Sequence, residues 1–202
     1  AVLITPCHQY PTGSVLSPAR RARLIAWAHA RNAVIIEDDY DAEYRYDTPP
    51  VSAMQGLDPA HLIYVGSVSK TLAPGIRLGW LVLPSSLVKA VANAKRTADR
   101  GSSVLEQLTL GAFIEQGYLD SHLRITRAIY KRRRATLLLA LKKYLPHFVP
   151  TGIDAGLHVM IEIPSSLNEE DIVGLAASEG IVITGAHMHL SLIHISEPTR
   201  PY

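Results

Sequence analysis

Short apolar runs alternate with helical patterns along this chain. Residues 1–5, 33–36, 61–65 and 78–83 are apolar runs of the kind that form strands buried on both faces of a sheet. Segments with helical spacing lie between these runs, and this alternation is typical of an α/β layered sheet. Because ligands bind beside the carboxyl ends of the strands in such sheets, we expect a site just after the second and third runs.

The first helical segment has a clear start and end. Ser17 and Pro18 supply a cap and a proline in the first turn, and the helix is predicted to run to about Asn32. Its apolar face carries Leu24, Ile25, Trp27 and Ala28.

The second half of the chain is richer in helix. Helices are predicted at 86–98, 104–116, 118–144 and 168–178, and strands at 157–163 and 181–183. The third of these helices is long and amphipathic, and prolines at positions 146 and 150 end it. We expect a domain boundary inside this long helix or just after it.

Composition narrows the class of protein. The 202 residues suffice for one sizeable domain, and a net charge of +2 is too small to predict a nucleic-acid surface. The basic run 131–134 is flanked by apolar residues with helical spacing, which favours a solvated helix face.

Cys7, the single cysteine, excludes an internal disulfide and suits a reducing cytosol. With no run of membrane-spanning length, the sequence predicts a cytoplasmic protein without membrane contact.

Both ends of the sequence suggest a fragment. The chain opens on a predicted core strand without a start methionine. Residues 190–202 resemble a translated sequencing adapter, so we expect a probable non-native tail that packs against nothing; a genuine flexible extension is the alternative.

The most informative stretch lies at residues 65–79. Lys70 stands between two hydroxyl residues, and Arg77 follows seven positions later. An enzymatic amine is chiefly useful for forming a Schiff base, often with pyridoxal phosphate. Ser67, Ser69 and Arg77 could then hold the phosphate, the arginine through a charged fork. A nucleotide-binding phosphate loop would need glycines where Tyr64 and Ser69 stand, and an ordinary surface lysine is the other alternative.

Carboxylates follow the second apolar run. Asp38 comes just after that run, with Tyr40 two positions later, which is what a pyridine nitrogen and a ring hydroxyl would need. A metal loop or a solvated face is the alternative for this acidic segment, although the alternating pattern of a calcium loop is absent. Tyr40 could equally be a buried aromatic residue with a satisfied hydroxyl.

These segments carry a family resemblance. Residues 5–13, 37–46 and 67–79 resemble the aminotransferase-like domain of MocR/GabR-type regulators, which belongs to the fold type I pyridoxal phosphate superfamily. Weaker matches continue to about residue 187. The resemblance implies a partial large domain at 1–130 and the start of the small α+β domain at 131–189.

The resemblance also assigns roles. Lys70 would hold pyridoxal phosphate as a Schiff base and act as general base, while Asp38, chosen over Asp39, would pair with the ring nitrogen. Tyr40 would contact the ring hydroxyl oxygen, and Ser67, Ser69 and Arg77 would bind the phosphate. Typical aminotransferases have asparagine where Tyr10 stands, so Gln9 or His8 is expected to replace its contact.

Two functions follow from the resemblance. The parent is either a GntR-family transcription regulator that uses the cofactor, alone or with an amino acid or amine ligand, as effector, or a stand-alone aminotransferase. A regulator would bind DNA only through an N-terminal winged-helix domain that is not part of this sequence. Either protein is expected to form a homodimer.

Overall fold

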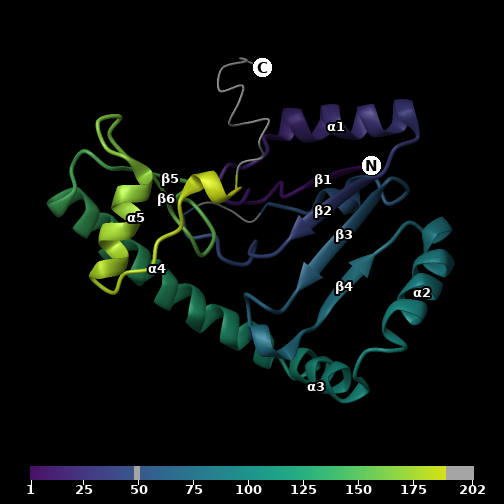
Figure 1. The fold of residues 1–202 in the computed structure, drawn as a ribbon. Helices are drawn as coiled ribbons and strands as arrows, with labels where there is room; N and C mark the ends of the chain where they lie inside the picture. Colours follow the sequence, from purple (N-terminus) through teal and green to yellow (C-terminus); the bar gives the residue numbers. More distant parts are fainter. Residues whose placement is uncertain (48–50, 190–202) are drawn as a thin grey trace.

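The computed structural model describes residues 1–47 and 51–189. At its centre is a four-stranded sheet in the order β1-β2-β3-β4 (Figure 1). The first three strands are parallel and β4 is antiparallel to β3, which confirms the predicted α/β fold with a mostly parallel sheet. The strands are β1 (Val2–Ile4), β2 (Ile35–Asp39), β3 (Leu62–Ser67) and β4 (Gly79–Val82).

Helix α1 (Pro18–Arg31) forms the core with the parallel strands. The Ser17 hydroxyl accepts a hydrogen bond from the backbone N–H of Arg20, and proline occupies the first turn, as the sequence predicts. Ala28 of the helix packs with Ile35, Met54 and Leu62, all of which are inaccessible to solvent. Burial of these apolar side chains is what fixes the helix against β2 and β3.

Strand β4 differs from its prediction. The apolar run at 78–83 suggested a strand buried on both faces, but every residue of β4 is exposed, with Trp80 at 41% and Leu81 at 48%. Alternate residues of a strand point to opposite faces, so both faces of β4 are partly open to solvent among the described residues. The strand therefore has the composition of a buried element and the environment of a surface one.

The remaining helices follow the predicted spacing closely. The long helix begins and ends at the predicted residues, and a two-stranded antiparallel sheet follows it. Figure 1 shows this helix running diagonally from α3 towards the α5 side of the molecule. The elements are α2 (Ser85–Asp99), α3 (Val104–Glu115), α4 (Tyr118–Tyr144), α5 (Glu169–Ser178), β5 (Val149–Thr151) and β6 (Met160–Glu162), with short 3₁₀ turns at Met54–Leu57, Pro74–Ile76 and Ala186–His189.

Two strand predictions need correction. Residues 181–183 form no strand, and Val182 is 92% exposed, because no strand edge among the described residues pairs with this segment. β1 is a strand, as predicted, and Val2 and Ile4 pack against the core cluster, but it lies at the edge of the described sheet and its other face is open, with Leu3 64% exposed. The tail predicted at 190–202 lies outside the described residues.

The chain returns from α4 to the sheet before reaching α5. Gly13 and Gly152 pack backbone to backbone, so closely that a Cβ on Gly13 would lie 2.3 Å from the Cα of Gly152. Tyr46 donates a hydrogen bond from its hydroxyl to the carbonyl of Gly156 at 2.8 Å. The first contact holds Gly152 against the loop that follows β1, and the second holds Gly156 to the segment that follows β2. Within the part of the chain that the structure describes, no helix has the length and apolar character needed to cross a membrane.

Candidate functional site

The predicted site residues surround the carboxyl ends of β2 and β3. In the parallel ladder Asp38 is paired with Val65, and Ser67 ends β3 two residues later. The two strands therefore deliver Asp38 and Ser67 to the same edge of the sheet, as parallel pairing requires.

The three predicted phosphate ligands line one cavity. Ser67, Ser69 and Arg77 border a space of about 520 Å³ whose opposite wall comes from β4 and α2. The Ser67 hydroxyl accepts a hydrogen bond from the backbone N–H of Ser69 at 3.0 Å, which holds the turn after β3. Arg77 adopts the left-handed conformation (φ 55°), a costly state for a non-glycine residue that places it at the cavity's rim. Two hydroxyls and a guanidinium facing one space can bind an anion such as a phosphate.

Lys70 lies in a loop fixed on both sides. Val68 and Thr71 are buried at 1% and 4% exposure, while Lys70 between them is exposed. The carbonyl of Thr71 accepts hydrogen bonds from His122 Nε2 at 3.0 Å and from the Tyr44 hydroxyl at 3.3 Å. Long helix α4 thus clamps the residue next to Lys70, and no acidic partner to the Lys70 amine exists among residues 1–47 and 51–189.

The two adjacent aspartates of β2 differ in their surroundings. Asp39 accepts a hydrogen bond from the Tyr64 hydroxyl at 3.0 Å, whereas no hydrogen bond to the Asp38 carboxylate occurs among the described residues. Burial, and then the nearby charge of Asp41, raise the pKa of Asp38. Asp38 is therefore a half-buried carboxylate whose charged form lacks a cation, which suits it to pair with a cationic ring nitrogen.

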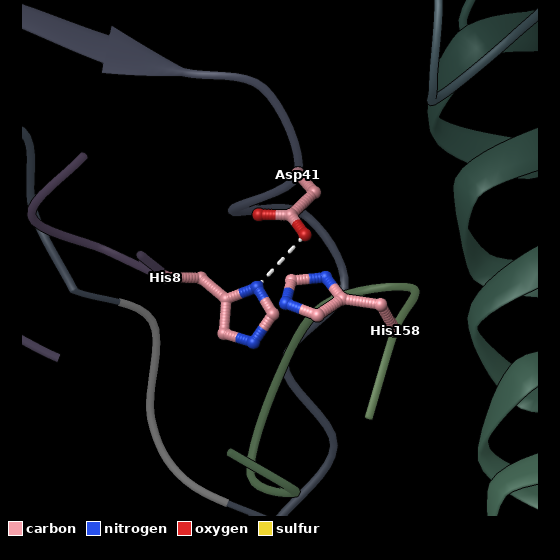
Figure 2. A group of neighbouring side chains, drawn as sticks. All are labelled: His8, Asp41 and His158. Carbon is pink, nitrogen blue, oxygen red and sulfur yellow. Dashed lines mark hydrogen bonds and ion pairs between the residues drawn. The ribbon is translucent and has the colours of Figure 1, made fainter. Parts of the chain in front are cut away.

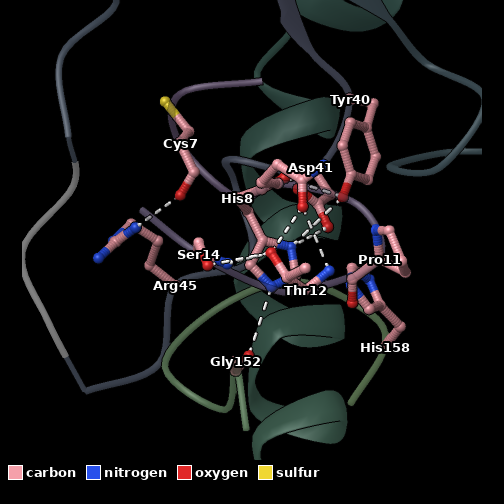
Figure 3. Close-up of polar contacts among 12 residues, drawn as sticks. Cys7, His8, Pro11, Thr12, Ser14, Tyr40, Asp41, Arg45, Gly152 and His158 are labelled. Carbon is pink, nitrogen blue, oxygen red and sulfur yellow. Dashed lines mark hydrogen bonds and ion pairs between the residues drawn. The ribbon is translucent and has the colours of Figure 1, made fainter. Parts of the chain in front are cut away.

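Tyr40 lies beside the loop that follows β1. Its hydroxyl donates to the carbonyl of His8 at 3.0 Å, and burial raises its pKa (Figure 3). Gln9 has a different environment: its side-chain oxygen accepts from the Thr12 hydroxyl at 2.6 Å and its amide donates to the Tyr10 carbonyl. The side chain of Gln9 closes its own turn, and His8 is the loop residue that contacts Tyr40.

A buried cluster next to Tyr40 was not predicted. Figure 2 shows His8, Asp41 and His158 together; His8 Nδ1 lies 2.9 Å from a carboxylate oxygen of Asp41, and the two imidazole rings are 4.5 Å apart. Burial and then the neighbouring His8 lower the pKa of His158. These residues come from three segments that are far apart in the sequence, and no spacing rule joins them. The only signal was the match of the loop and of residues 155–158 to the family pattern.

Known proteins share the sequence pattern of this chain. The family model for aminotransferase class I and II matches residues 1–192. An uncharacterized HTH-type transcriptional regulator, YhdI of Bacillus subtilis, is 37% identical over 89% of this chain and 39% of its own length. The probable rhizopine catabolism regulatory protein MocR of Rhizobium meliloti is 33% identical over 89% of this chain and 37% of its own length.

Solved structures agree with these relatives. The crystal structure of Pyrococcus horikoshii kynurenine aminotransferase, a complex with PMP, superposes with a TM-score of 0.84 at 28% identity, over 94% of this chain and 49% of that one. The chain thus spans about two fifths of the length of the regulators and half of the enzyme's. The family match, which includes all the described residues, confirms the resemblance, and the chain belongs to the aminotransferase class I and II family.

Proposed function

We propose that this chain is the pyridoxal-phosphate-binding, aminotransferase-like domain of a MocR-type transcription regulator of the GntR family. The observation that carries this proposal is the cavity bordered by Ser67, Ser69 and Arg77, which adjoins the Lys70 loop at the same sheet edge as Asp38. The similarity to two regulators supports the regulator as parent.

Pyridoxal phosphate is the cofactor that the family indicates, and the residues present fit it. The cavity offers hydroxyls and a guanidinium for the phosphate, and the raised pKa of Asp38 marks a carboxylate that a ring nitrogen's positive charge would stabilise. When bound, the cofactor supplies a ring that withdraws electrons from the carbon beside a substrate's amino group.

Each residue then has a defined task. Ser67, Ser69 and Arg77 would hold the phosphate, and Asp38 would keep a proton on the ring nitrogen. Tyr40 would orient the ring through its hydroxyl oxygen, for which it must turn its proton away from the His8 carbonyl. Lys70 would bind the cofactor covalently through its amine and move a proton to and from a bound amino compound. The clamp on Thr71 by His122 would keep that amine within reach of the ring.

The wider assignments rest on the regulators and enzymes that the chain resembles. Residues 1–130 would belong to the large domain and 131–189 to the small one, with an amino acid or amine as ligand. The complete protein would be a homodimer that binds DNA through a separate N-terminal domain. A stand-alone aminotransferase is the second candidate, supported by the fit to the kynurenine enzyme. A winged helix encoded upstream of Ala1 would decide for the regulator, and its absence for the enzyme.

Covalent attachment tests the core of this proposal. In the full-length protein, borohydride reduction should fix the cofactor on the peptide that contains Lys70, as read by absorbance and mass spectrometry. Lys70→Ala should abolish the labelled peptide, whereas Lys89→Ala, at an exposed position of α2, should leave it unchanged. A Lys70→Ala protein that still yields a reduced lysine adduct would show that another amine holds the cofactor.

A further inference from the structure

A second cluster of histidines lies at the opposite end of the sheet. His29 occupies the last turn of α1, and Asp58 and His61 lie in the turn that leads into β3. In Figure 1 the end of α1 and the start of β3 lie near the N-terminus, whereas the carboxyl ends of β2 and β3 point away from it. This cluster is therefore separate from the candidate cofactor site.

The three side chains converge on one carboxylate oxygen. Asp58 Oδ2 lies 2.9 Å from His29 Nε2 and 3.1 Å from His61 Nδ1, and the two imidazole rings are 4.3 Å apart. Exposure is graded across the cluster: the side chains of Asp58, His61 and His29 are 6%, 19% and 57% exposed. The carboxylate is held inside, and solvent reaches the cluster from the His29 side.

The core of the domain holds this arrangement in place. Ala28 and Leu62, the chain neighbours of His29 and His61, are both fully buried in the same core cluster. The backbone N–H groups of His61 and Leu62 donate to the carbonyl of Asp58 at 3.3 and 3.2 Å, which fixes the turn. A site whose ligands stand on rigid, packed elements needs little reorganisation to bind an ion.

The chemistry of the set favours a divalent transition-metal ion. Two imidazoles and one carboxylate are ligands that Zn²⁺ and its first-row neighbours accept, leaving one coordination position for water. Zinc bonds of about 2.0–2.1 Å place tetrahedral ligand atoms roughly 3.3–3.4 Å apart. The two distances from the histidine nitrogens to Asp58 Oδ2 therefore need to widen by only a few tenths of an ångström. The ligand atoms of His29, Asp58 and His61 already lie within 4.8 Å of one another.

The cluster of His8, Asp41 and His158 meets the same distance condition but has no exposed member. A Cβ at Gly156 would lie 2.0 Å from the His8 ring, and His158 Nε2 bonds the Pro11 carbonyl at 3.1 Å. His8 and Asp41 are 2% and 1% exposed and His158 is part-buried, so no member of this cluster is as open to solvent as His29. The difference in access singles out the cluster at the end of α1.

We propose that His29, Asp58 and His61 form a binding site for a divalent transition-metal ion such as Zn²⁺, with solvent completing the coordination. The ion would tie the end of α1 to the turn before β3. This site is independent of the cofactor at Lys70, so either proposal can fail without the other.

Zinc titration of the full-length protein, freed of metal by chelation, tests this site. Calorimetry should find Zn²⁺ bound by the parent protein, and His29→Ala and His61→Ala should each weaken that binding by more than about tenfold, because loss of a group that only orients a metal ligand already costs about 10- to 100-fold. Co²⁺ added in place of Zn²⁺ should give visible absorption bands that the same variants lose. His147→Ala removes an exposed histidine elsewhere and should titrate like the parent.

His29 is the safest position to vary because its side chain is largely exposed, so its loss should leave the fold intact. Unchanged borohydride labelling at Lys70 in His29→Ala would confirm that the variant is folded and that the two sites are independent. A parent protein that takes up no Zn²⁺, or His29→Ala and His61→Ala proteins that titrate like the parent, would overturn the proposal.

Discussion

The two sides of the sheet differ sharply in how well they are covered. On the α1 side, β2 buries Ile35 and Glu37 completely, and the Glu37 carboxylate accepts hydrogen bonds from the backbone N–H groups of Met54 and Gln55 at 2.9 and 3.0 Å. On the other side, all of β4 is exposed, although three of its four residues, Trp80, Leu81 and Val82, are large and apolar.

This difference separates a covered part of the sheet from an exposed part. Relatives of this chain are about twice its length or more, and the exposed side carries apolar residues on β4, α2 and α3 that suit contact with further protein. The predicted phosphate ligands line the cavity beside β4, whereas Asp38 is half-buried on the inner strand β2. The candidate site thus lies between the covered and the exposed parts of the sheet.

Shortening one side chain to alanine in each part of the sheet should give the largest difference in the free energy of unfolding. In the 202-residue chain, Ile35→Ala removes a fully buried side chain and should lower the free energy of unfolding by about 2–5 kcal/mol. Leu81→Ala on β4 should cost less than about 1 kcal/mol because the side chain is already half exposed. Urea unfolding followed by circular dichroism measures both. In the full-length protein the cost of Leu81→Ala should rise, and equal costs in the short chain would contradict the comparison.

Arg77 should separate binding from stability. Because the residue is exposed, Arg77→Ala should leave the unfolding midpoint of the full-length apoprotein nearly unchanged. Loss of a charged partner to the phosphate should weaken cofactor binding by about 1.5–3 kcal/mol, or roughly 10- to 150-fold in Kd. Absorbance titration with pyridoxal phosphate measures the affinity, and Arg100→Ala, on the loop after α2, serves as the control. An unchanged Kd would remove Arg77 from the phosphate site.

Much of this architecture was predictable because it depends on local rules. The capped start of α1 and the full extent of α4 follow from proline placement and apolar spacing, which act within a few residues. Motif spacing likewise predicted a shared phosphate site for Ser67, Ser69 and Arg77, and the three residues line one cavity.

The failures depend on contacts that are remote in sequence. The run at 181–183 has strand composition, but a strand forms only where a partner edge exists. Whether β4 is buried depends on which other segments pack on it, and the apolar pattern of the strand itself cannot reveal that. The buried cluster of His8, Asp41 and His158 needs a contact between residues 150 positions apart, and no local pattern encodes it.

Asp38→Asn should have opposite effects on the stability of the apoprotein and on the chemistry of the loaded protein. Burial and Asp41 raise the folded-state pKa of Asp38 above its usual 3.8, so ionisation of this carboxyl opposes folding. Stability from this group is fully present below pH 3.8 and is lost as pH rises through the folded pKa. Asparagine should therefore stabilise the apoprotein at neutral pH and give no gain in acid.

The same variant should impair the loaded protein. Without the charged partner the cofactor ring still binds, but proton removal from a bound amino compound slows, as stopped-flow absorbance can follow. Asp171→Asn, on the acidic first turn of α5, is the matched control. An apoprotein that Asp38→Asn destabilises at pH 7 would indicate that Asp38 has a cationic partner already.

His158 should give the smallest effect, visible only as a pH dependence. Burial and the nearby His8 lower its folded-state pKa below the usual 6.5, so the neutral imidazole is the form that the fold favours. Its contribution to stability is complete above pH 6.5 and is lost as pH falls towards the folded pKa, because the unfolded chain then binds the extra proton. His158→Gln should remove this component while retaining a donor for the Pro11 carbonyl. Urea midpoints at several values of pH between 5 and 8 would show it as a gap between parent and variant that narrows on acidification. His147→Gln, at an exposed position, should follow the parent across this range. A gap that is constant with pH would mean that His158 acts through packing alone, and that residues 152–158 are held to the loop after β1 by shape and not by the charge state of the buried cluster.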